Sequence, residues 1–150
     1  MDQGALKPWL LLVTKGHFEP QRVTQHILDV LTKYPTLRPK YDYYTYPSGE
    51  RAPTLCTFGT LPVKFQGTVY QFPVSLWYPV QYPEKPPIVQ VVPTSNMVVS
   101  PGKCVDATGI VQHPYLRQWD TQPGNTTRTV VEVLTALQAV FASEPPVRMK

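Results

Sequence analysis

Long apolar runs are scarce in this sequence of 150 residues, and their scarcity excludes some classes of protein. The run Trp9–Val13 contains five apolar residues, whereas a helix needs about 20 to cross a bilayer. The N-terminal region also lacks the charged leader and small-residue cleavage site that mark a secretory signal peptide. We therefore expect neither direct membrane insertion nor a signal peptide.

Cysteine and histidine are also few, and neither residue type shows the spacing of a metal site. The two cysteines, Cys56 and Cys104, form no disulfide-framework pattern, so reduced thiols in a cytosolic protein are expected, with Cys56 buried in a strand. The three histidines, His17, His26 and His113, are not spaced like zinc ligands. The sequence therefore predicts no metal and no cofactor.

Charge of one sign is not concentrated anywhere in the chain. Lysine and arginine total 14 against 10 acidic residues, for a net charge of +4, and the basic residues are scattered from Lys7 to Lys150. Nucleic-acid binding needs positive charge gathered on one face, so no nucleic-acid partner is expected. A hydrophobic content of 42% is typical of a globular protein, and the length of the chain fits one domain with its own core.

Proline is abundant, with 18 residues that mostly separate apolar segments and so indicate many turns and strand ends. Apolar residues at helical spacing lie between Pro20 and Pro35, which predicts a helix from Pro20 to Tyr34. The apolar run near Trp9 predicts a short helix before it, with Pro8 at its start.

A sequential antiparallel sheet is predicted after this helix. Aromatic residues from Tyr41 to Tyr46 meet a Pro-Ser-Gly turn, a pattern typical of a hairpin. Further strands are expected at Thr54–Leu61, Thr68–Trp77 and Ile88–Val92, with links that carry Pro62, Gly67, Pro79, Pro83, Pro86 and Pro87. The segment from Pro93 to Asp120 shows neither the helical nor the strand period, which predicts a long ordered loop with a functional role.

The last predicted element is a second packing helix. Its apolar stripe consists of Val130, Val133, Leu134, Leu137, Val140 and Phe141. Thr129 and Glu132 have the spacing of a capping box, and the helix is expected to end by Ser143. Together the elements predict one α+β domain over residues 1–150, with a four-stranded antiparallel sheet and N-terminal and C-terminal packing helices.

Several short motifs occur in the order and spacing of one known family. They are Gly59–Val63, Gly67–Tyr70, Pro73–Trp77, Tyr82–Ile88, Pro93–Met97, Gly102–Asp106, Pro114–Leu116, Trp119 and Glu144–Val147. Each motif is weak alone, but the set covers nearly the whole chain. On these motifs the chain resembles the ubiquitin-conjugating enzyme variant (UEV) domain at the N-terminus of the tumor-susceptibility/vacuolar protein sorting subunit of ESCRT-I.

The resemblance implies a ubiquitin-conjugating-enzyme-like fold that lacks the extra C-terminal helices of active enzymes. In active members a cysteine follows the glycine of the motif found here at Val105–Val111, and the matching position is Gln112. An amide cannot carry a ubiquitin thioester, so a non-catalytic protein is implied. The resemblance also implies a single domain excised from a longer chain with a proline-rich linker and a coiled coil.

The family binds proline-rich peptides of the type Pro-Thr/Ser-Ala-Pro, and the resemblance implies the residues that contact them. They are Thr60, Phe65, Tyr70, Gln71, Phe72, Pro73, Thr94, Met97, Pro145, Val147, Arg148 and Met149. A proline-rich ligand is already extended and packs its rings against aromatic walls, which Phe65 and Tyr70 would provide. Met97 would form an adaptable floor, and Gln71 and Thr94 would supply hydrogen bonds.

Four of these positions depart from the family pattern. Phe65 replaces a tyrosine, Gln71 an asparagine, Arg148 an aromatic residue and Met149 a serine. The departures bear on affinity and on the preferred peptide motif. Aromatic residues and Met beside strands are also common core residues, and this alternative stays open beside the groove.

The resemblance implies a second surface, which binds ubiquitin. Its contacts map onto Thr45, Tyr46, Pro47, Ser48, Trp77 and Gln90. Trp77 is expected to be a partly exposed anchor, with a buried core tryptophan as the alternative. Because Pro47, Ser48 and Gln90 differ from the family's residues, weak binding is expected, aided by simultaneous peptide engagement.

These implications describe an adaptor for the sorting of ubiquitinated cargo into multivesicular bodies, cytoplasmic and recruited to the endosome membrane. The implied partners are proline-rich peptides of upstream sorting factors or arrestin-like adaptors, ubiquitin, and other ESCRT-I subunits through regions outside this sequence. An accessory UEV protein that assists an active ubiquitin-conjugating enzyme in chain formation is the alternative.

A cysteine enzyme is the remaining alternative. Cys104 and His113 would form its thiolate pair, but the sequence supplies neither an orienting third group nor an oxyanion hole. The triplet that begins at His113 resembles the His-Pro-Asn signature of conjugating enzymes, but it contains Tyr115 in place of Asn and follows the nucleophile position. Asp106 and Trp119 are expected to be structural, as a loop-fixing carboxylate and a packed ring.

Overall fold

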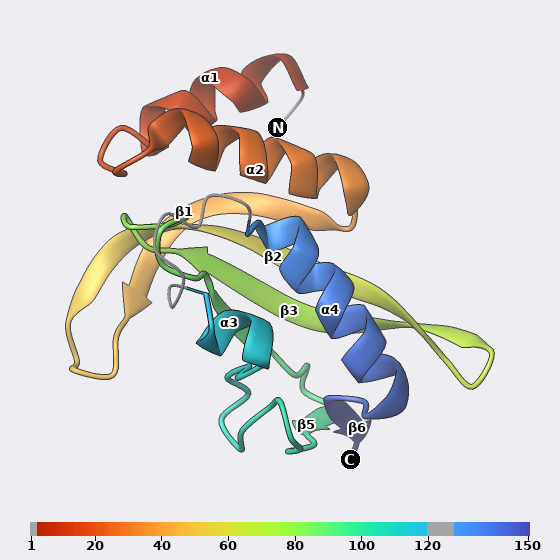
Figure 1. The fold of residues 1–150 in the computed structure, drawn as a ribbon. Helices are drawn as coiled ribbons and strands as arrows, with labels where there is room; N and C mark the ends of the chain where they lie inside the picture. The colour runs from red at the N-terminus through yellow and green to blue at the C-terminus, as the bar shows by residue number, and fades with distance from the viewer. Residues whose placement is uncertain (1–2, 120–127) are drawn as a thin grey trace.

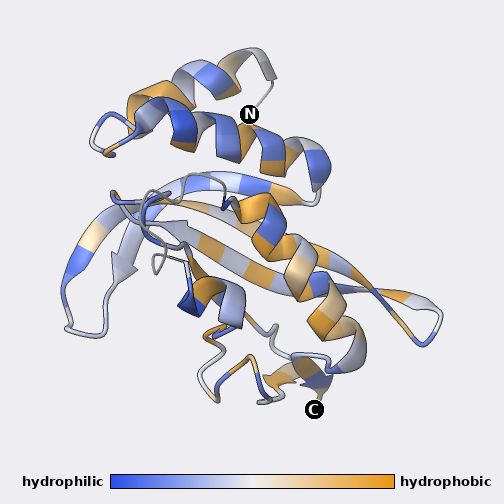
Figure 2. Ribbon diagram, viewed as in Figure 1, coloured by the Kyte–Doolittle hydropathy of each residue, from blue (hydrophilic) through white to orange (hydrophobic). Residues whose placement is uncertain are grey.

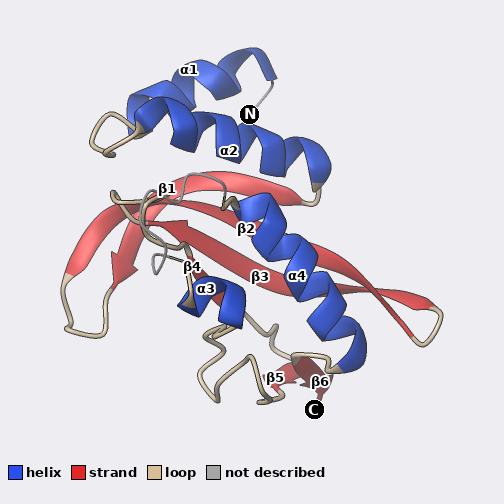
Figure 3. Cartoon of the chain, in the orientation of Figure 1, coloured by secondary structure: helices blue, strands red, loops and turns tan. Residues whose placement is uncertain are grey.

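The computed structural model describes residues 3–119 and 128–150, and its main feature is a four-stranded antiparallel sheet of order β1-β2-β3-β4. The elements in chain order are α1 (Gln3–Val13), α2 (Pro20–Lys33), β1 (Leu37–Thr45), β2 (Arg51–Phe65), β3 (Thr68–Tyr78), β4 (Ile88–Val91), β5 (Met97–Val99), α3 (Pro114–Arg117), α4 (Val130–Ser143) and β6 (Val147–Met149). Helix α4 crosses one face of the sheet, α2 packs beside α4, and α1 lies on the far side of α2 (Figures 1 and 3).

The face of the sheet beneath α4, here called the inner face, forms the main core. Side chains alternate between the two faces of a strand, so every second residue of the central strands points to this side. Leu55 on β2, Leu76 on β3 and Val89 on β4 are buried there. Helix α4 contributes Leu134 and Phe141 to the same core, and both are fully buried.

Helix α2 confirms the helix predicted at Pro20. It runs from Pro20 to Lys33 with Tyr34 as its C-cap, and its apolar stripe is buried at Val23, Ile27 and Val30. Its polar residues form the opposite face (Figure 2). This one-sided burial explains why periodicity alone located the helix.

The helix predicted at the N-terminus is longer than expected. It was expected to start at Pro8, but α1 begins at Gln3 and contains Pro8 in its interior. A proline there removes one i to i−4 hydrogen bond. The helix persists because its apolar residues pack: Leu10 is fully buried, and Leu6, Trp9 and Val13 lie against the core.

Strand β2 is also longer than predicted. Pro62 was expected in a link, but it lies within the strand opposite Gln71, and pairing continues to Phe65 opposite Thr68. The Pro62 carbonyl still has a partner, because it accepts a hydrogen bond from Nε2 of Gln138 at 2.8 Å. The β2–β3 hairpin therefore extends the sheet beyond the predicted end at Leu61.

Gly59 allows the sheet to pass close to the end of α2. Its φ is 144°, and a Cβ built there would lie 2.2 Å from the carbonyl oxygen of Thr36. Only glycine fits so close an approach in this conformation. Strand β1 begins immediately after this contact, at Leu37.

Helix α4 confirms the predicted C-terminal helix and its stop at Ser143. The hydroxyl of Thr129 caps it by accepting a hydrogen bond from the Glu132 N–H at 3.3 Å. Glu132 accepts the hydroxyl of Tyr115 at 2.6 Å. One half of the predicted capping box, the hydrogen bond to the Thr129 hydroxyl, is thus present. The Glu132 side chain bonds Tyr115 and so joins α4 to α3.

The predicted long loop after β4 is ordered over residues 93–119 and contains two short elements, β5 and α3, that the sequence did not reveal. The Oδ1 atom of Asp106 accepts hydrogen bonds from the Thr108 N–H at 2.9 Å and the Ile110 N–H at 3.0 Å. Trp119 is 1% exposed. Both predicted structural roles are confirmed, whereas Asp120, the predicted end of the loop, lies outside the described residues.

These observations confirm the predicted α+β fold with a four-stranded antiparallel sheet and packing helices at both ends of the chain. Among the described residues, no helix combines the length and the apolar character needed to cross a bilayer.

Candidate functional site

The β2–β3 hairpin extends past the C-terminal end of α4 (Figure 1), and residues of this hairpin line a groove. Phe65 on β2 and Tyr70 and Phe72 on β3 point to the inner face by the strand alternation. Further back along the sheet, this face is covered by α4. At the hairpin the helix has ended. The aromatic side chains there point to the same face as the core residues, but α4 does not cover them.

The three rings form a contiguous aromatic wall. Tyr70 stacks on Phe72 with ring centroids 6.0 Å apart and an interplanar angle of 9°, and Phe65 lies 6.0 Å from Tyr70. Phe72 also meets Phe141 of α4 edge to face at 6.0 Å. The wall is therefore anchored in the core at Phe72 and open at Tyr70, which is 44% exposed.

The opposite wall is the two-stranded β5–β6 sheet. Its register pairs Met97 with Met149 and Val99 with Val147. Pro145 leads from α4 into β6, and the Ser100 N–H donates to the carbonyl of Pro146 at 2.7 Å. The C-terminal segment is thus held in place as a wall by strand pairing.

The groove between the two walls has a volume of about 240 Å³. It is lined by Phe65, Tyr70, Gln71, Phe72, Met97, Pro145, Val147, Arg148 and Met149. All nine belong to the residues predicted to contact a peptide. Arg148 is the only charged residue among them, so the groove is largely apolar with one cation at its wall.

Three predicted contact residues lie outside this lining. Thr60 and Pro73 pair with each other further along the β2–β3 ladder. Thr94 precedes β5, and its hydroxyl donates to Oδ1 of Asn96 at 2.6 Å. Within the protein alone, Thr94 is therefore engaged in its own turn and does not line the groove.

The outer face of the sheet carries the second predicted surface. Tyr44, Cys56 and Trp77 form a small buried cluster there, with Tyr46, Phe58 and Ile88 partly buried against it. The Tyr44 ring lies 5.1 Å from Trp77 and 4.9 Å from Tyr46, so it joins the sheet to the β1–β2 hairpin.

Trp77 is not the partly exposed anchor that was expected. Its side chain is 7% exposed, and the Nζ of Lys40 lies 5.2 Å from its ring centroid. Its Nε1 is buried with no partner among the described residues. Tyr44 and Lys40 of the neighbouring strand β1 cover the ring. The expectation of a partly exposed Trp77 was therefore wrong, and the alternative of a packed tryptophan holds.

The other residues predicted to contact ubiquitin surround this cluster. Thr45 is the last residue of β1, Tyr46 follows it, and Pro47 and Ser48 form the exposed turn of the hairpin. Gln90 on β4 pairs with Ser75 two positions along the ladder from Trp77. The set therefore lies on the hairpin and the outer face, whereas the groove lies on the inner face at the far end of the sheet.

Sequence reasoning missed Lys40 and Phe58 as members of the outer face. Lys40 Nζ lies 5.1 Å from the Phe58 ring centroid and 3.7 Å from the carboxylate of Asp42. The strand alternation from Tyr44 back to Lys40 was the signal available in the sequence.

Gln112, which the family resemblance places at the nucleophile position, is hydrogen-bonded through both ends of its side-chain amide. Gln112 accepts from Nη2 of Arg117 at 2.8 Å and donates to Oδ2 of Asp106 at 3.3 Å. His113 caps α3, because its Nδ1 accepts from the Tyr115 N–H at 3.0 Å. The two ends of the Gln112 amide are thus tied to its own loop and to α3.

The cysteines match the predicted free thiols. Cys56 is fully buried, and burial raises the pKa of its thiol to about 12. Cys104 is half-buried and free. Within the part of the chain that the structure describes, no group of His, Cys, Asp and Glu side chains is arranged to hold a metal ion.

Comparison with known families and proteins gives concordant results. The UEV domain family model matches residues 10–149. The tumor susceptibility gene 101 protein of Homo sapiens is 35% identical over 136 residues, covering 91% of this chain and 34% of that protein. Protein ELC of Arabidopsis thaliana is 35% identical over 125 residues, covering 83% of this chain and 30% of that protein. The chain thus spans about a third of the length of these relatives.

Two solved structures share the fold. The yeast Vps23 UEV domain in complex with a Vps27 PSDP peptide has a TM-score of 0.78 and 22% identity, covering 93% of this chain and 92% of that one. The complex of the Vps23 UEV with ubiquitin has a TM-score of 0.79 and 23% identity, covering 97% and 99%. The four-stranded sheet and its packing helices are therefore a ubiquitin-conjugating-enzyme-like fold.

Proposed function

The chain belongs to the UEV domain family, and from this premise we propose that it is a non-catalytic adaptor domain. It binds proline-rich peptides of the Pro-Thr/Ser-Ala-Pro type in the groove and ubiquitin on the hairpin and outer face. The single observation that carries this proposal is an open aromatic groove whose nine lining residues all belong to the family's peptide-contact set.

The groove has the physical properties that such a peptide requires. An extended, proline-rich segment loses little conformational entropy on binding, and its rings pack well against flat aromatic faces. Tyr70 presents an exposed face, and the half-buried side chain of Met97 offers a polarizable surface opposite. We assign peptide contact to the nine lining residues first and to Thr60, Pro73 and Thr94 as contacts at the ends of the ligand.

Ubiquitin contact is assigned to Thr45, Tyr46, Pro47, Ser48 and Gln90. Trp77 supports this surface from beneath, since it packs against Tyr44. A surface of exposed turn residues over a packed cluster favours weak binding. Because the two proposed sites lie on opposite faces and at opposite ends of the sheet, neither ligand covers the other's contacts.

A non-catalytic role follows from the residue at the nucleophile position. Gln112 offers an amide, which does not form a thioester, and both ends of that amide are hydrogen-bonded. The Cys56 thiol is buried, with its pKa raised to about 12, so it is not a substitute nucleophile.

The cellular role is proposed from the named relatives. One is the ESCRT-I complex subunit tsg101 of Dictyostelium discoideum, 30% identical over 115 residues. By analogy, this chain serves ESCRT-I in sorting ubiquitinated cargo into multivesicular bodies and is recruited from the cytoplasm to endosomes. Residues 1–150 form a single UEV domain in this proposal, and contacts with other ESCRT-I subunits use regions outside this sequence.

The test is an amide NMR titration of the protein with a Pro-Thr-Ala-Pro peptide, a Pro-Ser-Asp-Pro peptide and then ubiquitin. Peptide should shift the signals of Tyr70, Met97 and Val147, and ubiquitin should shift those of Tyr46 and Gln90. Saturating peptide should leave the affinity for ubiquitin within about twofold, since the sites are separate.

Ubiquitin shifts without a response to either peptide would contradict the adaptor proposal. That result would favour the accessory UEV class, whose members assist an active conjugating enzyme. A stable complex with such an enzyme in a reconstituted chain-building assay would then establish the alternative.

A further inference from the structure

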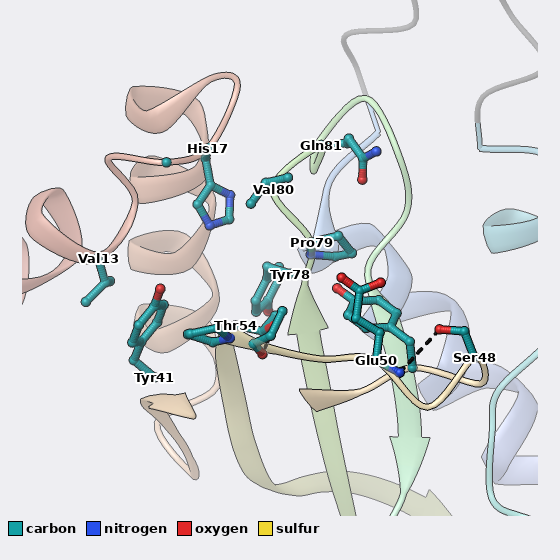
Figure 4. Close-up of a pocket in the computed structure, with 14 residues that line it drawn as sticks. Val13, His17, Tyr41, Ser48, Glu50, Thr54, Tyr78, Pro79, Val80 and Gln81 are labelled. Carbon is teal, nitrogen blue, oxygen red and sulfur yellow. Dashed lines mark hydrogen bonds between the residues drawn. The ribbon is translucent and has the colours of Figure 1, made fainter. Parts of the chain in front are cut away.

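A second cavity lies at the opposite end of the sheet from the groove (Figure 4). Its volume is about 440 Å³, and three separate segments line it: α1 with its connection to α2, the β1–β2 hairpin, and the β3–β4 connection. The Phe18 N–H donates to the Val80 carbonyl at 2.9 Å, which ties the first segment to the third. The cavity is therefore built by tertiary contacts between distant parts of the chain.

The charge of this cavity differs from that of the protein as a whole. The sequence carries a net charge of +4, but among the residues that the structure describes no lysine or arginine lines the cavity, and Glu50 is the only charged residue in its lining. Among the described residues, the Glu50 carboxylate accepts no hydrogen bond and forms no ion pair. It is therefore available to an external cation.

His17 supplies an unsatisfied polar group on the other side. Its side chain is 8% exposed, and its Nδ1 is buried without a hydrogen-bond partner among the described residues. Figure 4 shows the imidazole reaching into the cavity from the α1–α2 connection, across from Glu50 and Gln81. Burial lowers the pKa of His17, which favours the neutral ring at pH 7, and a neutral imidazole has one nitrogen that can accept a hydrogen bond.

Some of the donors around the cavity are used within the protein. The hydroxyl of Thr54 donates to the Ala52 carbonyl at 2.9 Å, and the backbone N–H of Tyr46 donates to the Glu50 carbonyl at 2.8 Å. The backbone N–H of His17 donates to the Thr14 carbonyl at 2.9 Å. Because the described lining residues include a carboxylate at Glu50 and no lysine or arginine, the cavity disfavours phosphate and other anions and favours a cation.

Aromatic surface completes the site. Tyr41, Tyr46 and Tyr78 line the cavity, and Tyr41 is 47% exposed. A cation over a tyrosine face is attracted to the ring, and next to this cavity the guanidinium of Arg51 already lies 5.2 Å from the ring centroid of Tyr43. Guanidinium suits such a site better than ammonium, because it stacks flat on rings, presents five N–H donors and accepts no hydrogen bond.

We propose that this cavity is a binding site for an arginine side chain of a protein ligand. Glu50 pairs with the guanidinium, Tyr41 stacks on it, and His17 accepts one of its N–H groups. Tyr46 and Ser48 border both this cavity and the surface assigned to ubiquitin, but the site is defined by its own residues and does not depend on that assignment.

The test is an amide NMR titration with acetyl-arginine amide as the probe. Saturable shifts are expected at His17, Glu50 and Val80, with the groove signals of Tyr70 and Met97 unchanged. Acetyl-citrulline amide, which is neutral and of nearly the same shape, should bind at least about tenfold more weakly, because it cannot form the charge-assisted pair. Acetyl-lysine amide should also bind more weakly than arginine.

Two variants locate the site. Glu50→Gln should weaken arginine binding about fivefold or more, whereas Glu84→Gln, an exposed glutamate of the β3–β4 connection outside the lining, should not. Tyr41→Leu should weaken it about threefold. Equal binding of citrulline or lysine, an unchanged affinity in Glu50→Gln, or shifts confined to other surfaces would overturn the proposal. None of these results depends on peptide or ubiquitin binding.

Discussion

The groove and the outer face of the sheet are both built on three neighbouring aromatic rings, yet they present very different surfaces. In the groove, Tyr70 stacks on Phe72 and remains 44% exposed because α4 has ended before it. On the outer face, Trp77 contacts Tyr44, lies beneath Lys40 and is 7% exposed. Aromatic residues thus form an open groove wall where no neighbour covers them and a buried cluster where one does.

The largest expected effect follows from this difference in cover. Trp77→Ala should lower the free energy of unfolding by about 3–5 kcal/mol, because it removes a large buried ring. Chemical denaturation measures the change. Tyr43→Ala, at an aromatic residue that is 57% exposed, is the matched control and should cost about 0.5 kcal/mol or less. A stable Trp77→Ala protein that has lost only ubiquitin binding would show that the ring is an interface anchor after all.

In the groove, the effect should fall on binding and not on folding. Tyr70→Ala should weaken Pro-Thr-Ala-Pro peptide binding by about 30-fold, which corresponds to about 2 kcal/mol. Its free energy of unfolding should change by about 1 kcal/mol or less, since the ring is half exposed. Calorimetric titration and denaturation separate the two effects.

Val69→Ala is the control for Tyr70→Ala, because Val69 is exposed on the same strand and points to the other face. It should retain peptide affinity. A comparable loss of stability and of peptide binding in Tyr70→Ala would mean that Tyr70 belongs to the core, and the contrast between the two regions would be wrong.

A smaller effect is expected from the single charge in the groove. Arg148 lines it, so an acidic residue in the ligand should be favoured. Arg148→Gln should weaken binding of a Pro-Ser-Asp-Pro peptide by about two- to fivefold, the size of an exposed ion pair. Binding of Pro-Thr-Ala-Pro should hardly change.

The control for Arg148 is Lys64→Gln, at an exposed cation of β2 outside the groove lining. The advantage of the acidic peptide should also shrink as salt is raised, because ions screen exposed charges. Equal weakening of both peptides in Arg148→Gln would assign the residue a packing role instead.

The smallest expected effect is that of pH on the free energy of unfolding, through a contact between α2 and the start of α4. Tyr82 Oη accepts the Val130 N–H at 3.0 Å and lies 2.8 Å from Nδ1 of His26, so a neutral His26 that carries its proton on Nε2 can accept the Tyr82 hydroxyl. Protonation of the imidazole would remove this acceptor. Burial, with a contribution from the nearby Arg22, lowers the pKa of His26 below 6.5.

The unfolded chain therefore binds more protons at this site below about pH 6.5 than the folded chain does. The free energy of unfolding should decrease as pH falls through this range and should be insensitive to His26 above it. His26→Gln, which keeps a hydrogen-bonding side chain without the titration, should reduce the dependence. Denaturation at pH 5.5 and 7.5 measures it, and an unchanged slope would place the titration elsewhere.

Local patterns in the sequence located the elements whose packing is one-sided. The stripes of α2 and α4 predicted both helices closely, and Thr129 was identified correctly as a cap. Capping and amphipathic spacing depend on neighbours a few residues away, so they are readable from the chain. The nine residues that line the groove are all among those that the family resemblance implied, although Phe65, Gln71, Arg148 and Met149 differ from the family's residues.

The features that the sequence did not predict depend on contacts between residues that are distant in the chain. Strand β6 is three residues long and forms only because Val147 and Met149 pair with β5 across the intervening α3 and α4. Pro62 was predicted to end a strand, but a hairpin pairing that continues beyond it keeps it in the ladder. The cover over Trp77 comes from Lys40 on another strand.

The sequence by itself determined the two long packing helices α2 and α4 and the four-stranded antiparallel sheet, because these depend on residue identity and short-range pattern. Only the tertiary structure decided that Tyr70 remains open while Trp77 is covered. It also decided that Glu50 and His17 share a cavity, although they lie on different segments. Exposure and cavity shape are set by where the helices end and which strands adjoin, and these are properties of the assembled core.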